Sequence, residues 1–263
     1  MVENPDPGRF DCDDNEGHDL NDEAVYGPLE SRRYGHVIGI NPLPGNEKLC
    51  AFNCVYCQLG WTPHQDLKGY RHATVEEMEA GLRVILPEDG LKGIVICGNG
   101  EPTRHEAFAE MVTALRAVRD ELAPDVPLIC LTNGEMLLDP PINAALSLLD
   151  ECAVKLDVGS YDALRRVNLP RTDVDLKELA KGICDLGAVV QTCLFEGILS
   201  NTSDEDLSAW HGALRAARPS RVDCYTISRP PATWRIHPVD SDRLVEIAQA
   251  ARAETGLDVR ACI

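Results

Sequence analysis

Short apolar segments alternate with segments of helical periodicity along most of this 263-residue chain. The apolar segments show little polar alternation, so each is expected to be a strand buried on both faces, as in a parallel sheet covered by helices. Strands are predicted at residues 36–40, 93–97, 127–131, 152–157, 189–195 and 222–227, with a short seventh at 257–260. Helices are predicted at residues 74–85, 105–122, 142–149, 176–186, 204–217 and 241–255. These units indicate a single α/β domain whose strands end at one shared rim, where such folds place their chemistry.

The composition predicts a soluble protein of the cytoplasm. Hydrophobic residues make up 44% of the chain and charged residues 26%, which is ordinary for a globular domain. No run of about 18 apolar residues occurs that could span a membrane, and the N-terminus lacks the basic-then-apolar pattern of an export signal. Eleven cysteines, an odd number at irregular spacing, argue against a disulfide framework and favour a reducing compartment.

The net charge of −18 is spread unevenly along the chain. Residues 1–30 contain ten Asp and Glu against one Arg and so contribute −9, which leaves −9 for the other 233 residues. We therefore predict an acidic, solvated arm at residues 1–26 and one domain at residues 27–263, which begins with a loop at residues 27–35. Phosphate contacts need clustered Lys and Arg, so the acidic balance disfavours tight binding of RNA, although a local basic patch remains compatible with it.

Three cysteines stand close together soon after the first predicted strand. Cys50, Cys54 and Cys57 have C-x3-C-x2-C spacing, with Tyr56 just before the third thiol. Three thiolates can converge on one metal centre, but a closed site needs four ligands. In a cubane iron–sulfur cluster, three protein ligands leave one iron open to a substrate or cofactor. Zinc would need a fourth ligand, and His64 is the only His or Cys that follows closely.

Polar side chains follow the next two predicted strands at the same rim. Glu101 lies in the turn at residues 98–103 and could hold an ammonium group, although a tight turn with a solvated Glu would explain it equally well. Asn133 follows the third strand. It could offer its amide to sugar hydroxyls or to a carboxylate, or it could be an ordinary turn residue.

Two further candidates lie farther along the chain. Lys155 and Asp157 are two residues apart in the fourth predicted strand and so share one face of it. A charged pair in an apolar strand is costly unless it meets a partner or a ligand, so the pair either lines the site or forms a structural ion pair. Arg229 follows the sixth strand and either reaches the rim or lies on the surface.

The remaining cysteines are expected to be structural or incidental. Free cysteine packs as a small apolar residue. Core packing is therefore predicted for Cys97, Cys130, Cys152, Cys184, Cys193 and Cys224. Cys12 is interpreted as an incidental thiol of the arm, and Cys262 is a minor candidate for a metal ligand.

These motifs together resemble the radical S-adenosylmethionine (SAM) superfamily. The resemblance rests on the cysteine motif with its tyrosine, the Gly-Asn-Gly-Glu-Pro turn at residues 98–102 and the Thr-Asn-Gly at residues 132–134. Longer strings at residues 31–33, 39–45 and 54–60 resemble its wyosine-synthase-like branch of iron–sulfur oxidoreductases. The similarity extends from about Gly27 to Pro231.

The resemblance implies a partial, TIM-like (β/α)6 barrel with parallel strands that binds a [4Fe–4S] cluster and SAM. The cysteines of the motif would hold the cluster, and SAM would chelate its open iron. The implied SAM-binding residues are Tyr56 at the adenine, Asn99, Gly100, Glu101 at the methionine ammonium, Asn133 near the ribose or carboxylate, and Lys155 with Asp157. One electron would cleave SAM to methionine and a 5′-deoxyadenosyl radical that abstracts hydrogen from a substrate. Lys155 and Asp157 are the candidate catalytic residues, with a Schiff base at Lys155 as an alternative.

Two departures from the branch leave the substrate open. Wyosine-forming enzymes are expected to carry extra upstream cysteines for a second cluster, whereas only Cys12 precedes the motif here. The chain also has no flavodoxin-like domain, so an external one-electron donor of flavodoxin or ferredoxin type is expected. A small molecule or a peptide is favoured as substrate. The alternatives are wyosine-type modification of a tRNA base and a non-catalytic zinc- or cluster-binding module.

Overall fold

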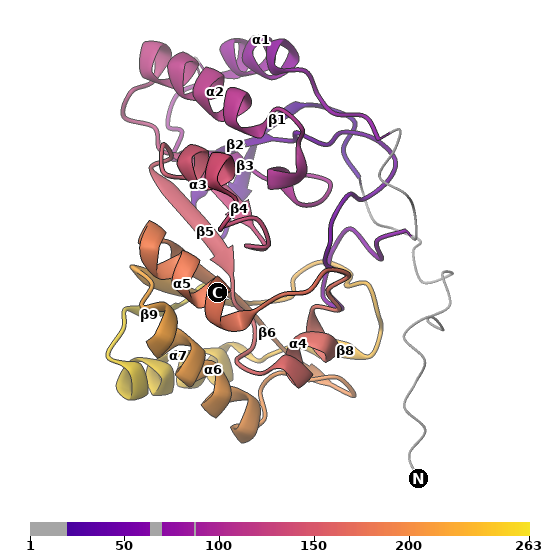
Figure 1. Cartoon of the computed structure of the whole chain (residues 1–263), viewed down its shortest axis with the longest axis vertical. Helices are drawn as coiled ribbons and strands as arrows, with labels where there is room; N and C mark the ends of the chain where they lie inside the picture. Colours follow the sequence, from indigo (N-terminus) through magenta and orange to yellow (C-terminus); the bar gives the residue numbers. More distant parts are fainter. Residues whose placement is uncertain (1–19, 64–69, 87) are drawn as a thin grey trace.

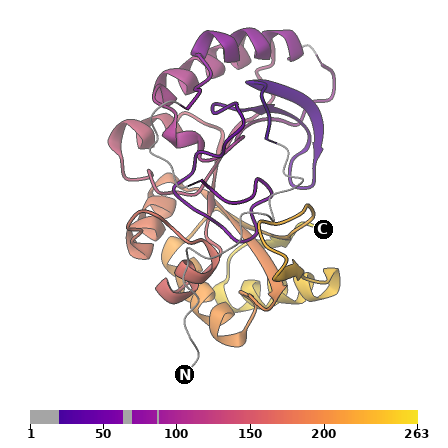
Figure 2. The same ribbon diagram turned by 90° about the vertical axis from the view of Figure 1, so that its right-hand side faces the viewer.

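Six parallel strands form the centre of a curved sheet in the computed structural model, which describes residues 20–63, 70–86 and 88–263. These strands are β2 (Gly35–Ile40), β3 (Gly93–Ile96), β4 (Leu128–Thr132), β5 (Glu151–Lys155), β6 (Val189–Gly197) and β7 (Arg221–Thr226). Each pairs in parallel with the next along the chain. β1 (Val25–Ser31) and β9 (Val259–Ala261) end the sheet and do not pair with each other, so the barrel is open (Figure 2). The predicted α/β fold with a partial parallel barrel is confirmed.

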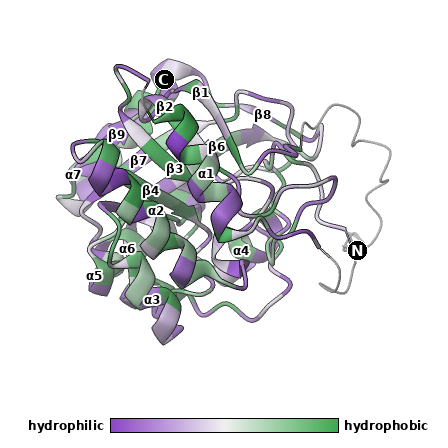
Figure 3. Ribbon diagram, turned by 90° about the horizontal axis from the view of Figure 1, so that it is seen from above, coloured by the Kyte–Doolittle hydropathy of each residue, from purple (hydrophilic) through white to green (hydrophobic). Residues whose placement is uncertain are grey.

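Helices cover the outer, convex face of this sheet (Figure 1). They are α1 (Val75–Ile85), α2 (Phe108–Leu122), α3 (Pro140–Leu146), α5 (Leu176–Leu186), α6 (Asp204–Ala217) and α7 (Ser241–Thr255). Local chemistry sets their ends: Thr74 and Glu77 form a capping box at the start of α1, and Gly187 ends α5 with φ of 60°. Hydrophobic residues gather on the strands, such as β3, while the helices alternate polar and apolar positions (Figure 3).

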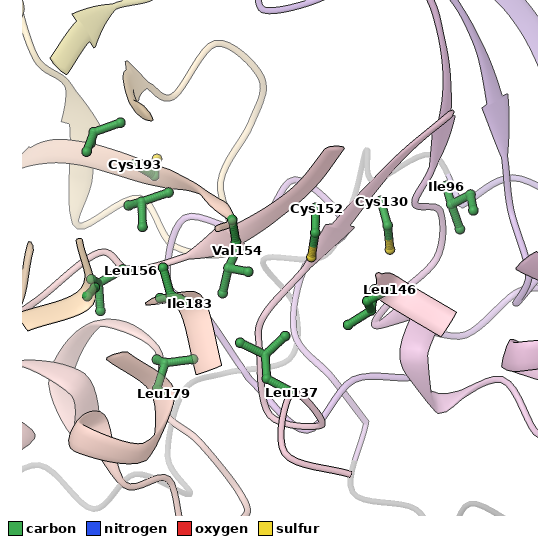
Figure 4. Packing of buried hydrophobic residues seen from close by; sticks show 14 of the residues in the cluster. Ile96, Cys130, Leu137, Leu146, Cys152, Val154, Leu156, Leu179, Ile183 and Cys193 are labelled. Carbon is green, nitrogen blue, oxygen red and sulfur yellow. The ribbon is translucent and has the colours of Figure 1, made fainter. Parts of the chain in front are cut away.

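The main hydrophobic core fills the layer between the strands and the helices. Cys130 and Cys152 lie there with Leu137 and Leu146 (Figure 4). Core packing is confirmed for four of the predicted cysteines, namely Cys130, Cys152, Cys193 and Cys224. Cys97 packs against a second cluster of Val37, Val95 and Ile129, whereas Cys184 is only half-buried because it sits at the edge of the apolar face of α5.

Strand β1 replaces the loop that was predicted at residues 27–35. It runs antiparallel to β2, and a register shift between Tyr26 and Leu29 accommodates Gly27 and Pro28, the residues that suggested a loop. A Cβ at Gly39 would lie 2.2 Å from the Tyr26 ring, so the missing side chain makes room for that ring. Part of the predicted arm thus belongs to the sheet, and its residues 1–19 lie outside the described residues.

Three short elements were not predicted. They are the 3-10 helix η2 (Pro102–Arg104), the helix α4 (Tyr161–Val167) and the strand β8 (Ile236–Pro238), which pairs antiparallel with β6. Each is shorter than the window of about 11–18 residues over which hydrophobic periodicity is recognised. No helix in the described ranges is long and apolar enough to cross a membrane.

Candidate functional site

The cysteine loop, residues 50–57, is attached to the turn that follows β3. The Leu49 amide donates to the Asn99 carbonyl at 2.9 Å, and the Glu101 amide donates to the Leu49 carbonyl at 2.8 Å. This short parallel bridge between Leu49 and Gly100 extends the β2–β3 pairing past the ends of both strands. The first cysteine and the Glu-Pro turn are therefore held together by backbone hydrogen bonds at the carboxyl rim of the barrel.

The other side of the cysteine loop is attached to the end of α4. The Asn53 amide donates to the Asn168 carbonyl at 2.9 Å, and the Val55 amide donates to the Val167 carbonyl at 3.0 Å. Because α4 follows β5, these bonds connect the loop to a part of the rim beyond β4. The loop is thus fixed at both sides by backbone contacts that leave its cysteine side chains free.

Nitrogen donors surround the sulfur atoms of this loop. The Phe52 amide lies 3.4 Å from the Cys50 sulfur, and the Asn133 side-chain nitrogen lies 3.6 Å from the same atom. The Asn168 side-chain nitrogen donates to the Cys54 sulfur at 3.3 Å. Donors of this kind favour the thiolate form, which is the form that binds metal.

Burial nevertheless opposes ionisation of two of these thiols in the apo-protein. Burial raises the pKa of Cys50 to about 12 and that of Cys54 to about 11. A metal centre would have to displace these protons, as metal binding to thiols ordinarily does. The described residues contain no group of three or more His, Cys, Asp or Glu arranged to hold one metal ion, and His64 lies outside them. A cubane cluster instead gives each thiolate its own iron, so three thiols with nearby N–H donors fit a [4Fe–4S] cluster.

Glu101 is a buried carboxylate directly beside this loop. It is 2% exposed. One of its oxygens accepts hydrogen bonds from the hydroxyls of Thr103 at 2.7 Å and Thr132 at 2.6 Å. The other accepts from the backbone amide of Asn133 at 2.6 Å. Burial nevertheless raises the pKa of Glu101 to about 7. Since Asn133 also faces Cys50, the structure brings these three predicted residues together.

Asn99 has a different position from the one expected of a ligand-binding amide. Its side-chain nitrogen donates to the carbonyls of Asn21 at 2.7 Å and Gly45 at 3.0 Å, and its oxygen accepts from the Asn21 amide at 3.0 Å. The Asn41 side chain accepts from the Asn99 amide at 3.1 Å. All these contacts join segments of the chain, so the Asn99 side chain holds the turn in place.

Asp157 is saturated with protein partners. Its side chain is fully buried and lies 3.1 Å from the Lys155 ammonium. It accepts hydrogen bonds from the Cys193 amide and from the Asn168 side chain, both at 2.8 Å, and from the Tyr56 hydroxyl. The predicted pair on one strand face is therefore formed as an ion pair, and Asp157 also binds the hydroxyl of Tyr56, a residue of the cysteine loop.

Lys155 lies between two aromatic rings. Its ammonium is 4.7 Å from the ring centres of both Tyr56 and Tyr225, and it donates a hydrogen bond to the Tyr225 hydroxyl. Burial alone would lower the pKa of Lys155, but the adjacent Asp157 carboxylate raises it above its ordinary value. Lys155 is thus held as a cation, which disfavours its action as a free amine toward a carbonyl.

Several site residues carried no sequence signal. Asn168, which is 2% exposed, contacts both Cys54 and Asp157 and leaves its own side-chain oxygen buried without a partner in the described residues. Tyr225 and Lys48 belong to no recognised motif; the fold brings Tyr225 to the site, whereas Lys48 lies two residues before Cys50. Arg229 is exposed. Cys262 lies at the far edge of the sheet, where its amide bonds to the Cys224 carbonyl at 2.8 Å, and Cys12 lies outside the described residues.

Comparison with known sequences agrees with this geometry. A sequence model described as the radical SAM superfamily matches residues 48–209, more than half of the chain. A protein of Brachyspira hyodysenteriae described as GTPase Obg is 23% identical over 247 residues, which cover 91% of this chain and 35% of that protein. A UPF0026 protein of Synechocystis sp. is 36% identical over 162 residues, which cover 61% of this chain and 58% of that protein. The chain therefore spans less than two thirds of the length of both relatives.

Comparison with solved structures shows the same fold. A radical SAM methyltransferase from Sphaerobacter thermophilus gives a TM-score of 0.65 at 19% identity, over 86% of this chain and 65% of that chain. SuiB of Streptococcus suis, bound to precursor peptide SuiA, gives a TM-score of 0.63 at 16% identity, over 86% of this chain and 47% of that chain. TYW1 with a lysine-pyruvate adduct bound gives a TM-score of 0.57 at 15% identity, over 82% of this chain and 73% of that chain. At these identities the likeness concerns the fold alone.

Proposed function

The chain belongs to the radical SAM superfamily of iron–sulfur enzymes, and we propose that it cleaves SAM reductively and abstracts hydrogen from an organic substrate. Cys50, Cys54 and Cys57 would hold the [4Fe–4S] cluster. The observation that carries the proposal is the backbone bridge between Leu49 and residues 99–101, here called the seam, which joins the cysteine loop to the Glu-Pro turn. Asn133 contacts both the Cys50 thiol and the Glu101 carboxylate beside this seam. One compact site can thus hold both the cluster and the amino-acid end of SAM.

The residues of the chain would bind and orient the two cofactors. When bound, the cluster and SAM supply a 5′-deoxyadenosyl radical, and the protein supplies position and exclusion of water. Glu101 would hold the methionine ammonium, whose charge favours the ionised form of this buried carboxylate. Asn133 would lie near the ribose or the carboxylate. Tyr56 would lie at the adenine.

The remaining predicted site residues would support this arrangement. Asn99 and Gly100 would shape the turn that presents Glu101, because the Asn99 side chain ties that turn to neighbouring segments. Lys155 and Asp157 would position Tyr56 through the hydrogen bond between the Asp157 carboxylate and the Tyr56 hydroxyl. Both residues would thus act through another side chain instead of touching the substrate.

Detection of 5′-deoxyadenosine tests the proposed activity most directly. The protein is reconstituted anaerobically with iron and sulfide, reduced with dithionite and incubated with SAM, and the products are analysed by mass spectrometry. We expect a brown protein, an EPR signal that changes when SAM is added, and 5′-deoxyadenosine. Cys54→Ser should lose all three, whereas Cys184→Ser, a half-buried cysteine on α5, should retain them. A wild-type protein that takes up tightly bound zinc and no iron would overturn the proposal in favour of a binding module.

We favour a small molecule or a peptide as substrate. SuiB, which has the same fold, was captured with a precursor peptide, and this supports the choice. TYW1 was captured with a lysine-pyruvate adduct. An adduct at Lys155 is disfavoured here by its ion pair with Asp157. Borohydride treatment in the presence of pyruvate should therefore leave Lys155 unlabelled by mass spectrometry. An external one-electron donor of flavodoxin or ferredoxin type would supply the electron, and free cysteines throughout the described residues fit a cytoplasmic reaction.

A further inference from the structure

Lys48 is a buried cation that none of the motifs includes. It is 3% exposed, and its ammonium donates a hydrogen bond to the Gly60 carbonyl at 3.1 Å. Across the described ranges of the chain, no carboxylate lies within ion-pair distance of Lys48, although 14 ion pairs of Lys or Arg are present there. Burying an ammonium group is costly unless an anion compensates it. The fold therefore maintains a positive charge whose counter-charge is missing among these residues.

The three thiols of the cysteine loop are the groups that face this charge. Lys48 lies two residues before Cys50. Its partner Gly60 is joined to the other end of the loop, because the Gly60 amide donates to the Cys57 carbonyl at 3.1 Å. The bond from Lys48 to Gly60 also spans the loop from one side to the other. A negatively charged group bound by these cysteines would therefore lie close to the Lys48 ammonium.

A cluster held by three thiolates carries negative charge that increases on reduction. A [4Fe–4S]2+ core with three thiolates has a net charge of −1, and one added electron makes it −2. In a site of low polarity, a fixed positive charge nearby stabilises the second state more than the first. Net charge and hydrogen bonds around the sulfurs are known determinants of cluster reduction potentials.

We propose that Lys48 favours reduction of the cluster: its ammonium compensates the charge of the thiolate-bound cluster and raises the cluster's reduction potential. The proposal rests on the proposed function, since it requires that these cysteines hold a cluster. The cluster gains one electron from an external one-electron donor, the donor is oxidised by one electron, and Lys48 keeps its proton.

Redox titration of the reconstituted protein, followed by EPR, tests this proposal without measuring turnover. The variants are Lys48→Met and Lys48→Gln, which remove the charge, and Lys48→Arg, which keeps it. We expect the neutral variants to lower the equilibrium constant for reduction at least tenfold, which is about 59 mV for a one-electron couple. Lys48→Arg should stay close to wild type. Lys181→Met, the same change on the outer face of α5, should have no effect.

Each outcome separates the charge from a purely structural role. Neutral variants that bind the cluster with an unchanged potential would overturn the proposal and leave Lys48 as a brace between the loop and Gly60. Loss of iron from all three variants, Lys48→Arg included, would do the same. Loss of iron from both neutral variants but not from Lys48→Arg would support charge compensation. A wild-type protein that binds no cluster would instead count against the proposed function itself.

Discussion

Glu101 shows how the environment of one carboxylate both opposes and supports its charge. Two threonine hydroxyls and the Asn133 amide donate to its oxygens, which favours ionisation. Burial opposes ionisation more strongly, so its pKa rises to about 7. In the apo-protein, Glu101 therefore changes protonation state near neutral pH, although its ordinary pKa lies far below that range.

We predict that ionisation of Glu101 lowers the stability of the apo-protein as the pH rises. The unfolded chain releases this proton near pH 4.5, whereas the folded protein keeps it until about pH 7. The folded state binds more protons in this window, so the free energy of unfolding should fall there by about 3 kcal/mol and then level off. Urea unfolding followed by circular dichroism between pH 4.5 and 8 measures the change.

Two substitutions isolate this effect from the other titrating groups. Glu101→Gln cannot ionise, so the free energy of unfolding of wild type should fall relative to that of Glu101→Gln by about 3 kcal/mol as the pH rises through the window. Glu110→Gln on the exposed side of α2 should leave the pH profile of wild type intact. Parallel profiles for wild type and Glu101→Gln would show that burial does not govern this carboxylate.

Removing Lys155 should be strongly destabilising, because Asp157 would remain as a buried charge. The Asp157 side chain is fully buried and the pair is 3.1 Å apart. We predict that Lys155→Met lowers the free energy of unfolding by about 3–5 kcal/mol. The double variant Lys155→Met with Asp157→Asn should recover part of this loss, because the remaining carboxamide carries no charge. Chemical unfolding of both measures the difference, and a double variant less stable than Lys155→Met would contradict the charge argument.

At the scale of elements, the seam between the cysteine loop and the turn after β3 depends on one glycine. Gly100 has φ of 151°, and a Cβ there would lie 1.8 Å from the Leu49 carbonyl oxygen. We predict that Gly100→Ala separates the cysteine loop from Glu101 and lowers the iron retained after reconstitution. Gly45→Ala is the matched control, since φ is 138° but nothing lies within 4 Å of its Cβ position.

The comparison of these two glycines separates backbone strain from collision. Gly45→Ala should cost about 1–3 kcal/mol of stability through strain alone and keep the cluster. Gly100→Ala should cost more and lose iron. Thermal unfolding and iron content measure both effects. Equal effects of the two substitutions would mean that the close contact with Leu49 is not needed for the site.

Local sequence predicted the elements that carry long patterns and missed those that the fold imposes. The six central strands were recognised because both their faces are buried, which gives continuous apolar runs. Strand β1 was not predicted because its glycine and proline are typical of loops, and the strand accommodates them by a register shift. The cysteines, Glu101 and Asn133 follow strand ends in sequence and could be placed at one rim. Asn168 and Tyr225 meet the site through packing of distant segments, which no local pattern encodes. Lys48 lies two residues before Cys50, but a single lysine beside a motif carries no signal of its own.

At the scale of the whole molecule, charge bears on the choice between RNA and smaller substrates. The chain carries a net charge of −18, and several arginines of the described residues form ion pairs within the protein. Arg104 pairs with Glu135, and Arg166 pairs with Asp206. Such cations are poorly available to phosphates, which weakens the electrostatic basis of nucleic-acid binding.

We therefore predict weak tRNA binding with a shallow dependence on salt. A protein that makes six to ten phosphate contacts loses roughly 10³–10⁵ in affinity between 50 and 200 mM salt. We expect less than about a tenfold change over that range, measured by fluorescence anisotropy with labelled bulk tRNA. Tight, steeply salt-dependent binding would instead favour the tRNA alternative. In that case Arg229→Glu, which changes an exposed arginine after β7, should weaken binding more than Arg260→Glu, because Arg260 is already paired with Asp258.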